Sequence, residues 1–137
     1  MRAVLDTNVL ISGIIATGVP HELLVYGFDH EYQIVVSVET LTELRETLRK
    51  YPERFRMDES EVQTEVETIR YFAEFVDPDE EIAVVEPDPD DDKFLEAAVA
   101  GDVDYVVSGD SHLLDIKSFR GIDIVEPRTF YDRLNAQ

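Results

Sequence analysis

The chain has 137 residues, the size of one ordinary domain, and 44% of them are hydrophobic, which is enough to form a core. It contains no cysteine, which excludes disulfides, thiolate zinc sites and cysteine nucleophiles. No apolar run approaches the roughly 18 residues of a membrane span, and the first residues predict a strand and not a signal peptide. We therefore expect one cytoplasmic domain with no membrane association, although its 31 acidic and 12 basic residues give an unusual formal net charge of −19.

The first half of the chain predicts two strands, each followed by helices. Residues 2–5 and 33–36 are short apolar runs that end at polar residues, which is typical of buried strands. We expect an apolar helix over 9–16, a second helix with Pro20 in its first turn, and a third helix capped by Ser37.

The second half continues the alternation. Apolar residues recur every three or four positions from a cap at Asp58 or Ser60 to Val76, which predicts a long helix. Residues 82–85 predict a short strand. The remaining expected elements are a helix ending at Gly101, a strand over 104–108, a helical turn over 111–114, a strand over 121–125 and a terminal helix over 127–134.

Alternating strands and helices predict an α/β fold with a mostly parallel central sheet flanked by helices. In such sheets, ligands bind at the carboxyl ends of the strands. Asp6 follows the first strand and Asp110 follows the strand over 104–108, so we expect both at the same edge of the sheet.

Two further acids have positions from which they can converge with this pair. Glu43 is in the second turn of one predicted helix, and Asp92 is in the first turn of another. Clustered carboxylates raise one another's pKa unless a cation accompanies them, and an oxygen-only set suits Mg²⁺ or Mn²⁺ better than zinc. Asp6, Glu43, Asp92 and Asp110 are therefore the predicted metal ligands.

Asn8 and Ser108 flank two of these acids and are expected to orient a carboxylate or a bound water. Each acid also has a simpler interpretation. Asp6 and Asp110 suit turns or helix caps, Asp92 suits the positive end of a helix dipole, and Glu43 suits a solvated helix face. In a chain with 31 acidic residues, the number of acids is no evidence for a metal site, whereas their position at the ends of strands is.

Three segments, taken together, resemble the PIN-domain family in order and spacing: VLDTNVLIS, VSVETLTELRETL and DPDDDKFLEAAVAGDVDYVVSGDSHLL. The similarity covers residues 2 to about 131 and is greatest to the branch that contains toxins of toxin–antitoxin systems. It implies a three-layer, Rossmann-like PIN fold and a ribonuclease that uses one or two Mg²⁺ or Mn²⁺ ions. An antitoxin partner and a homodimer are expected on the same ground, with the 62–76 helix as a suggested dimer surface.

The family's four acids match Asp6, Glu43, Asp92 and Asp110, and its hydroxyl position matches Ser108. Asp92 is chosen for the third acid because the apolar residues after it then align with the family's helix. Asp91 is the alternative.

An RNA substrate conflicts with the acidic charge, because proteins that bind nucleic acid usually present a basic face. Lys50 lies seven positions after Glu43, about 20° from its helical face, and is a candidate phosphate contact together with Arg49. The alternative is that Arg49 pairs with neighbouring acids.

Three other functions are weighed against the ribonuclease. The first is a PIN-like interaction module without catalysis, which four intact acids disfavour. The second is a structure-specific DNA nuclease, which site chemistry alone does not separate from a ribonuclease. The third is phosphoryl transfer by an Asp nucleophile, which needs a second Asp where this chain has Asn8.

The net charge of −19 also predicts a salt-loving host. The chain should repel itself at low ionic strength, and about 1 M salt shortens the Debye length to about 3 Å. A moderately acidic cytosolic protein is the alternative.

Overall fold

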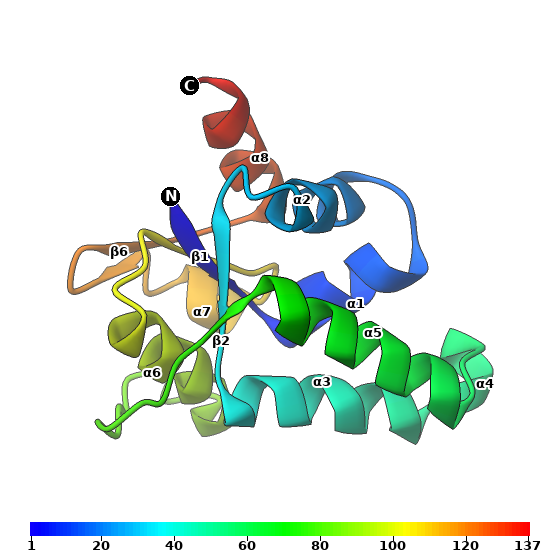
Figure 1. The fold of residues 1–137 in the computed structure, drawn as a ribbon. Helices are drawn as coiled ribbons and strands as arrows, with labels where there is room; N and C mark the ends of the chain where they lie inside the picture. Colours follow the sequence, from blue (N-terminus) through cyan, green and yellow to red (C-terminus); the bar gives the residue numbers. More distant parts are fainter.

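A six-stranded sheet passes through the middle of the computed structural model, which describes residues 1–137 apart from the side chain of Pro52 (Figure 1). The strand order is β3-β2-β1-β4-β6-β5, and every neighbouring pair is parallel except β5 and β6. The strands are β1 (Arg2–Leu5), β2 (Gln33–Val36), β3 (Glu74–Phe75), β4 (Tyr105–Val107), β5 (Ser118–Phe119) and β6 (Ile122–Val125). The predicted α/β class with a mostly parallel sheet is confirmed.

Helices connect the strands and cover both faces of the sheet. They are α1 (Thr7–Ile15), α2 (Val19–Phe28), α3 (Val38–Lys50), α4 (Pro52–Phe55), α5 (Glu59–Phe72), α6 (Asp92–Ala100), α7 (Ser111–Leu114) and α8 (Pro127–Asn135), with a short 3₁₀ turn, η1 (Pro89–Asp91), before α6. No single helix in the described part of the chain is long and apolar enough to cross a membrane, and α1 with α2 passes that test only as a pair bent by 93°.

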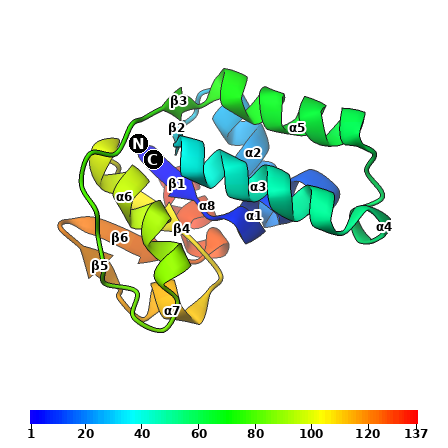
Figure 2. The same ribbon diagram turned by 90° about the horizontal axis from the view of Figure 1, so that it is seen from below.

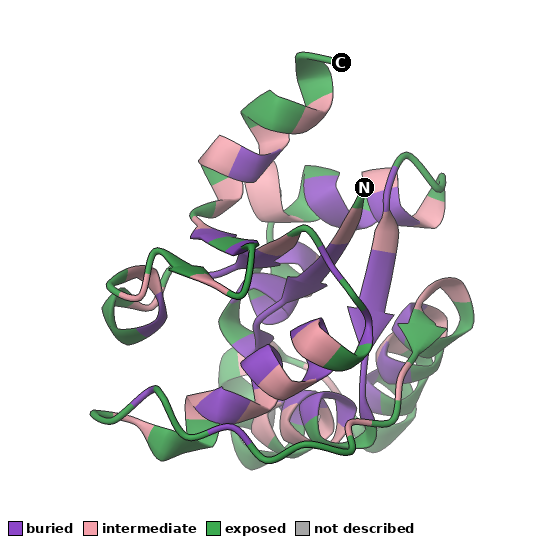
Figure 3. Cartoon of the chain, turned by 90° about the vertical axis from the view of Figure 1, so that its left-hand side faces the viewer, coloured by how far each residue is buried: buried purple, intermediate pink, exposed green. Residues whose placement is uncertain are grey.

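Two hydrophobic clusters lie on opposite faces of the sheet because neighbouring strand residues point to opposite sides. Ala3 and Leu5 face the cluster that includes α1, α2, α3, α5 and α8, whereas Val4 faces the cluster built on α6. The central strands are consequently buried on both sides, as the purple strands in Figure 3 show. Their near-continuous apolar sequence follows from this double burial.

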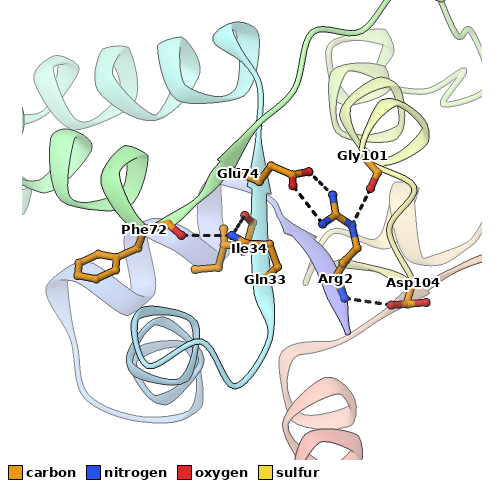
Figure 4. A network of polar contacts seen from close by, with 7 residues as sticks. All are labelled: Arg2, Gln33, Ile34, Phe72, Glu74, Gly101 and Asp104. Atoms are coloured by element: carbon orange, nitrogen blue, oxygen red, sulfur yellow. Dashed lines mark hydrogen bonds and ion pairs between the residues drawn. The ribbon is translucent and has the colours of Figure 1, made fainter.

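A polar network fastens the edge of the sheet where β1 begins (Figure 4). The Arg2 guanidinium pairs with Glu74 and donates from Nε to the Gly101 carbonyl at 2.8 Å, and the Arg2 amide donates to Asp104 at 3.0 Å. One residue therefore ties β1 to the edge strand β3, to the end of α6 and to the segment before β4. This network lies at the end of the sheet opposite to the carboxyl ends of the parallel strands.

The prediction of a helix as far as Val76 is wrong at its carboxyl end. Helix α5 ends at Phe72, and residues 74–75 form β3 beside β2. The Val76 amide continues this pairing by donating to the Val36 carbonyl at 2.8 Å. An unpaired edge of β2 and the Arg2–Glu74 contact therefore outweigh helical periodicity in this segment.

The predicted strand over 82–85 is also wrong, because these residues form no strand. Ile82 and Val85 are buried, as a strand prediction would require, but carboxylates replace a neighbouring strand as hydrogen-bond partners. The Ile82 amide donates to Glu96 Oε2 at 3.0 Å, and the Val84 and Val85 amides donate to a single oxygen of Asp92 at 3.0 and 2.9 Å.

Candidate active site

The carboxyl ends of β1, β2 and β4 lie next to the helices that follow these strands. Figure 2 views the molecule from below, and α3 and α6 lie next to each other on this side. Helix α1 begins directly after β1, α3 directly after β2, and α7 shortly after β4. Side chains at these junctions therefore share one edge of the sheet, as predicted for a parallel α/β fold.

Asp6 occupies the junction between β1 and α1 and is only 4% exposed. It is the N-cap of α1, with Oδ1 accepting from the Val9 amide at 2.9 Å. Its other oxygen accepts a hydrogen bond from Ser108 Oγ. The cap interpretation is thus correct for Asp6, yet both oxygens are also held in one orientation toward the edge of the sheet.

Asp110 is tied to the same serine. Ser108 Oγ accepts from the Asp110 amide at 2.9 Å while it donates to Asp6, so one buried hydroxyl links the two acids. Asp110 also caps α7, with Oδ1 accepting from the His112 amide at 2.9 Å. Ser108 therefore lies between the two strand-end acids.

Glu43 reaches the site from α3, whose start is fixed by a capping box between Ser37 and Thr40. Its Oε1 accepts from Thr7 Oγ1 at 2.6 Å, and its Oε2 forms an ion pair with the Lys93 ammonium. The carboxylate is therefore held by α1 on one side and by α6 on the other.

The structure brings Asp91, and not Asp92, to the other three acids. The η1 turn ends at Asp91, and α6 begins at Asp92. Successive helical residues point about 100° apart, so the two neighbours cannot face the same way. Asp92 is 8% exposed and turns toward the 82–85 loop, where it accepts the two amide hydrogen bonds described above.

A small cavity of about 80 Å³ lies at the point where these elements meet. Four carboxylates, from Asp6, Glu43, Asp91 and Asp110, line it. Its other lining residues are Thr7, Asn8, Thr47 and Phe94. Asn8 is thus part of the cavity lining, whereas Asp92 lines a separate depression with residues 78–83.

Two of these carboxylates have a raised pKa. Burial, above all, raises the pKa of Asp6, and the charges of Asp110 and Glu43 add to it against the hydrogen bonds from Ser108 and Val9. The pKa of Asp91 is raised to about 8 by burial, then by interaction with the Asp110 carboxyl and the charges of Asp88 and Asp6. Oδ2 of Asp91 is buried and has no hydrogen-bond partner among the described residues.

These features fit a hard divalent cation. An unpartnered buried carboxylate oxygen and a set of oxygen donors are what Mg²⁺ or Mn²⁺ requires. Burial is the main cause of the raised pKa of Asp6 and Asp91, and a cation would offset both the burial and the charge repulsion that adds to it. Asp110 belongs to a second group as well, because ligand atoms of Asp88, Asp110 and His112 lie within 4.8 Å of one another.

A larger groove of about 670 Å³ adjoins the cavity along α3 and shares Glu43 and Thr47 with it. Lys50 lines this groove, as expected for a residue on the face of Glu43, and Lys93 lines it from α6. Arg49 instead pairs with Glu59 at the start of α5, with Nε donating at 2.9 Å. The structure thus separates the two residues predicted as phosphate contacts.

Sequence patterns did not identify Thr7, Thr47 or Lys93 as site residues. Thr7 was detectable in principle, since it stands directly between Asp6 and Asn8. Lys93 had one weak signal, a basic residue directly after an acidic run. Its contact with Glu43 depends on the packing of α3 against α6, which no local pattern encodes.

A family model described as the PIN domain matches residues 2–112 of the chain. The fold is similar to the crystal structure of PAE2754 from Pyrobaculum aerophilum, with a TM-score of 0.71 and 17% sequence identity over 100% of this chain and 91% of that one. It is also similar to VapBC2 from Rickettsia felis, solved bound to a DNA fragment from its promoter, with a TM-score of 0.61 and 15% identity over 90% and 97% of the two chains. No curated protein matches the chain by sequence.

Proposed function

The chain belongs to the PIN-domain family, a family of nucleases, and we propose that it is an endoribonuclease that depends on Mg²⁺ or Mn²⁺. The observation that carries the proposal is the convergence of Asp6, Glu43, Asp91 and Asp110 on one cavity at the carboxyl edge of the sheet. Asp91 takes the third place in this set, instead of Asp92. RNA is proposed as the substrate from the resemblance of the sequence to ribonucleases of the family.

In the proposed reaction, these four carboxylates would hold the cation. When bound there, a divalent cation supplies Lewis-acid activation of a water molecule and stabilises the negative charge of the leaving oxygen. The surrounding residues keep the carboxylates in place: Ser108 orients Asp6 and Asp110, and Thr7 orients Glu43.

Cleavage of labelled RNA in high salt tests this function. The protein should cut single-stranded RNA with Mn²⁺ or Mg²⁺, lose activity in EDTA, and cut a DNA strand of the same sequence more slowly. Asp6→Asn should lower the rate at least about 100-fold, because it removes a ligand charge whose position is fixed on both sides. Preferential cleavage of DNA would favour the structure-specific DNA nuclease, and no cleavage of either strand would favour the interaction module.

A toxin role is a finer proposal, supported by the sequence resemblance and by fold similarity to VapBC2. If it holds, expression of the chain alone should arrest growth, and Asp91→Asn should remove the arrest without lowering the protein level. Co-expression with a cognate antitoxin should also restore growth. Normal growth during expression of active protein would contradict the toxin role and leave the nuclease proposal intact.

Homodimer formation is likewise proposed, but not through the apolar side of α5. Val62, Val66 and Ile69 are buried in the chain's own core, and the exposed apolar residues nearby are Tyr71 and Phe75. Light scattering of the purified protein in high salt measures the mass directly, and a monomer would contradict the proposal.

A further inference from the structure

Both oxygens of Glu43 are already engaged by the chain itself. Oε1 accepts from Thr7 Oγ1 at 2.6 Å, and Oε2 pairs with the Lys93 ammonium. The ion pair is partly buried, with the Lys93 side chain 19% exposed and that of Glu43 28% exposed. A cation that takes Glu43 as a ligand therefore meets a positive charge of the protein on the same carboxylate.

The side chain of lysine is suited to an ion pair that can be broken. Its ammonium is a point charge on a flexible stem, whereas an arginine would grip a carboxylate through two parallel hydrogen bonds. Lysine is also the rarer base here, with three in the chain against nine arginines. Two of those three, Lys50 and Lys93, line the groove beside Glu43.

Lys93 has a polar path away from Glu43. The 670 Å³ groove into which it opens is lined largely by polar side chains, including Glu39, Glu46 and Asp90. An ammonium that leaves Glu43 can thus remain hydrated and close to other carboxylates. The position of Lys93 at the second residue of α6 gives no separate benefit, because the positive end of a helix dipole disfavours a cation.

We propose, on the basis of the cation-dependent function above, that Lys93 is a positioning residue that acts as an exchangeable counter-ion of Glu43. Its ammonium holds the carboxylate while no divalent cation is bound, and it moves into the groove when one binds. Lys93 therefore weakens cation binding, since the ion pair must be broken and the ammonium repels the incoming charge.

Titration with Mn²⁺, followed by the loss of the free-ion electron paramagnetic resonance signal, measures this competition. Lys93→Met keeps the stem and removes the charge, and it should bind Mn²⁺ roughly threefold to tenfold more tightly than wild type. Lys50→Met is the matched control: it removes the same charge from the same groove but from no contact with Glu43, and should change affinity less than about twofold.

Thermal melts provide a readout independent of binding stoichiometry. Lys93→Met should melt below wild type in EDTA, because Glu43 loses its partner, and should show the larger increase in Tm on addition of Mn²⁺. Unchanged Mn²⁺ binding by Lys93→Met would overturn the proposal, because Lys93 would then not compete with the cation. Weaker binding would also overturn it, because Lys93 would then order Glu43 for the cation. A failure of the proposed function would give a different result. Asp91→Asn would then bind Mn²⁺ as tightly as wild type does, and both proposals would fall.

Discussion

Asp91 is the residue whose environment in the cavity is most costly for a charge. Burial and three neighbouring acids raise its pKa to about 8, and one of its oxygens has no hydrogen-bond partner among the described residues. The neighbouring Asp92 carries the same side chain, but two backbone amides donate hydrogen bonds to one of its oxygens. One aspartate carboxylate thus lines the cavity, whereas the next one along the chain holds the 82–85 loop in place.

The raised pKa of Asp91 predicts a pH dependence of stability without metal. An unfolded aspartate loses its proton near pH 3.9, whereas folded Asp91 keeps it until about pH 8. The free energy of unfolding should therefore fall as pH rises through this window and level off above it. Urea denaturation at several pH values in EDTA and high KCl measures the slope.

Asp91→Asn should remove most of this slope, and Asp92→Asn, the matched control, should keep it. Divalent cations compete with the proton for Asp91, so the stabilisation by Mn²⁺ should increase from pH 6 to pH 8. Equal slopes in wild type and Asp91→Asn would show that Asp91 is not the titrating group.

Lys50 and Arg49 are adjacent in sequence but contact different parts of the molecule. Lys50 faces the groove beside the cavity, whereas Arg49 joins α3 to Glu59 of α5. Lys50→Ala should weaken RNA binding roughly threefold to tenfold in moderate salt with Mn²⁺ affinity unchanged, because one phosphate contact is lost. Arg49→Ala should bind RNA like wild type. Equal losses in the two variants would point to general charge rather than a contact at Lys50.

At the scale of elements, strands that could be predicted were those with their own apolar run. The four-residue strands β1, β2 and β6 are bounded by polar residues or glycine, and β4 is a similar run that ends at Ser108. The two-residue strands β3 and β5 were missed, because each exists only through pairing with a neighbour. Helices with clear periodicity, such as α3, were placed within a few residues.

The loop before α6 depends on Asp92 in place of a partner strand, which predicts its role in stability. Asp92→Ala should lower the free energy of unfolding by about 1–3 kcal/mol, because the Val84 and Val85 amides lose their acceptor in a partly buried setting. Asp92→Asn retains an acceptor oxygen and should recover most of the loss. Denaturant melts of both variants make the comparison, and equal destabilisation by Ala and Asn would contradict the hydrogen-bond explanation.

At the scale of the whole molecule, the site was more predictable than its detailed geometry. Asp6 and Asp110 were identifiable because parallel strands deliver their carboxyl ends to one edge. Glu43 had weaker support from its helix position, which the resemblance strengthened, because a helix with several glutamates does not reveal which one faces inward. The choice between Asp91 and Asp92 depends on where η1 gives way to α6, a boundary of one residue that apolar spacing does not fix.

The net charge also acts on the whole molecule. With 31 acidic and 12 basic residues, repulsion opposes the compact state and is screened by salt. The Tm should therefore increase steadily from low salt to about 1 M KCl, where the Debye length is about 3 Å. Mg²⁺-free buffer with EDTA separates this general effect from binding at the cavity. A Tm that falls as KCl increases would contradict the salt-loving interpretation.

The most direct test of the site is the RNA cleavage rate of Asp91→Asn beside that of Asp92→Asn, with Mn²⁺ in high salt. Each variant removes one carboxylate charge, and the two positions are adjacent, so their difference isolates the cavity. Asp91→Asn should lose at least about 100-fold in rate together with Mn²⁺ binding, whereas Asp92→Asn should stay within about threefold of wild type. Loss of activity in Asp92→Asn with retention in Asp91→Asn would contradict the assignment of the cavity as the active site.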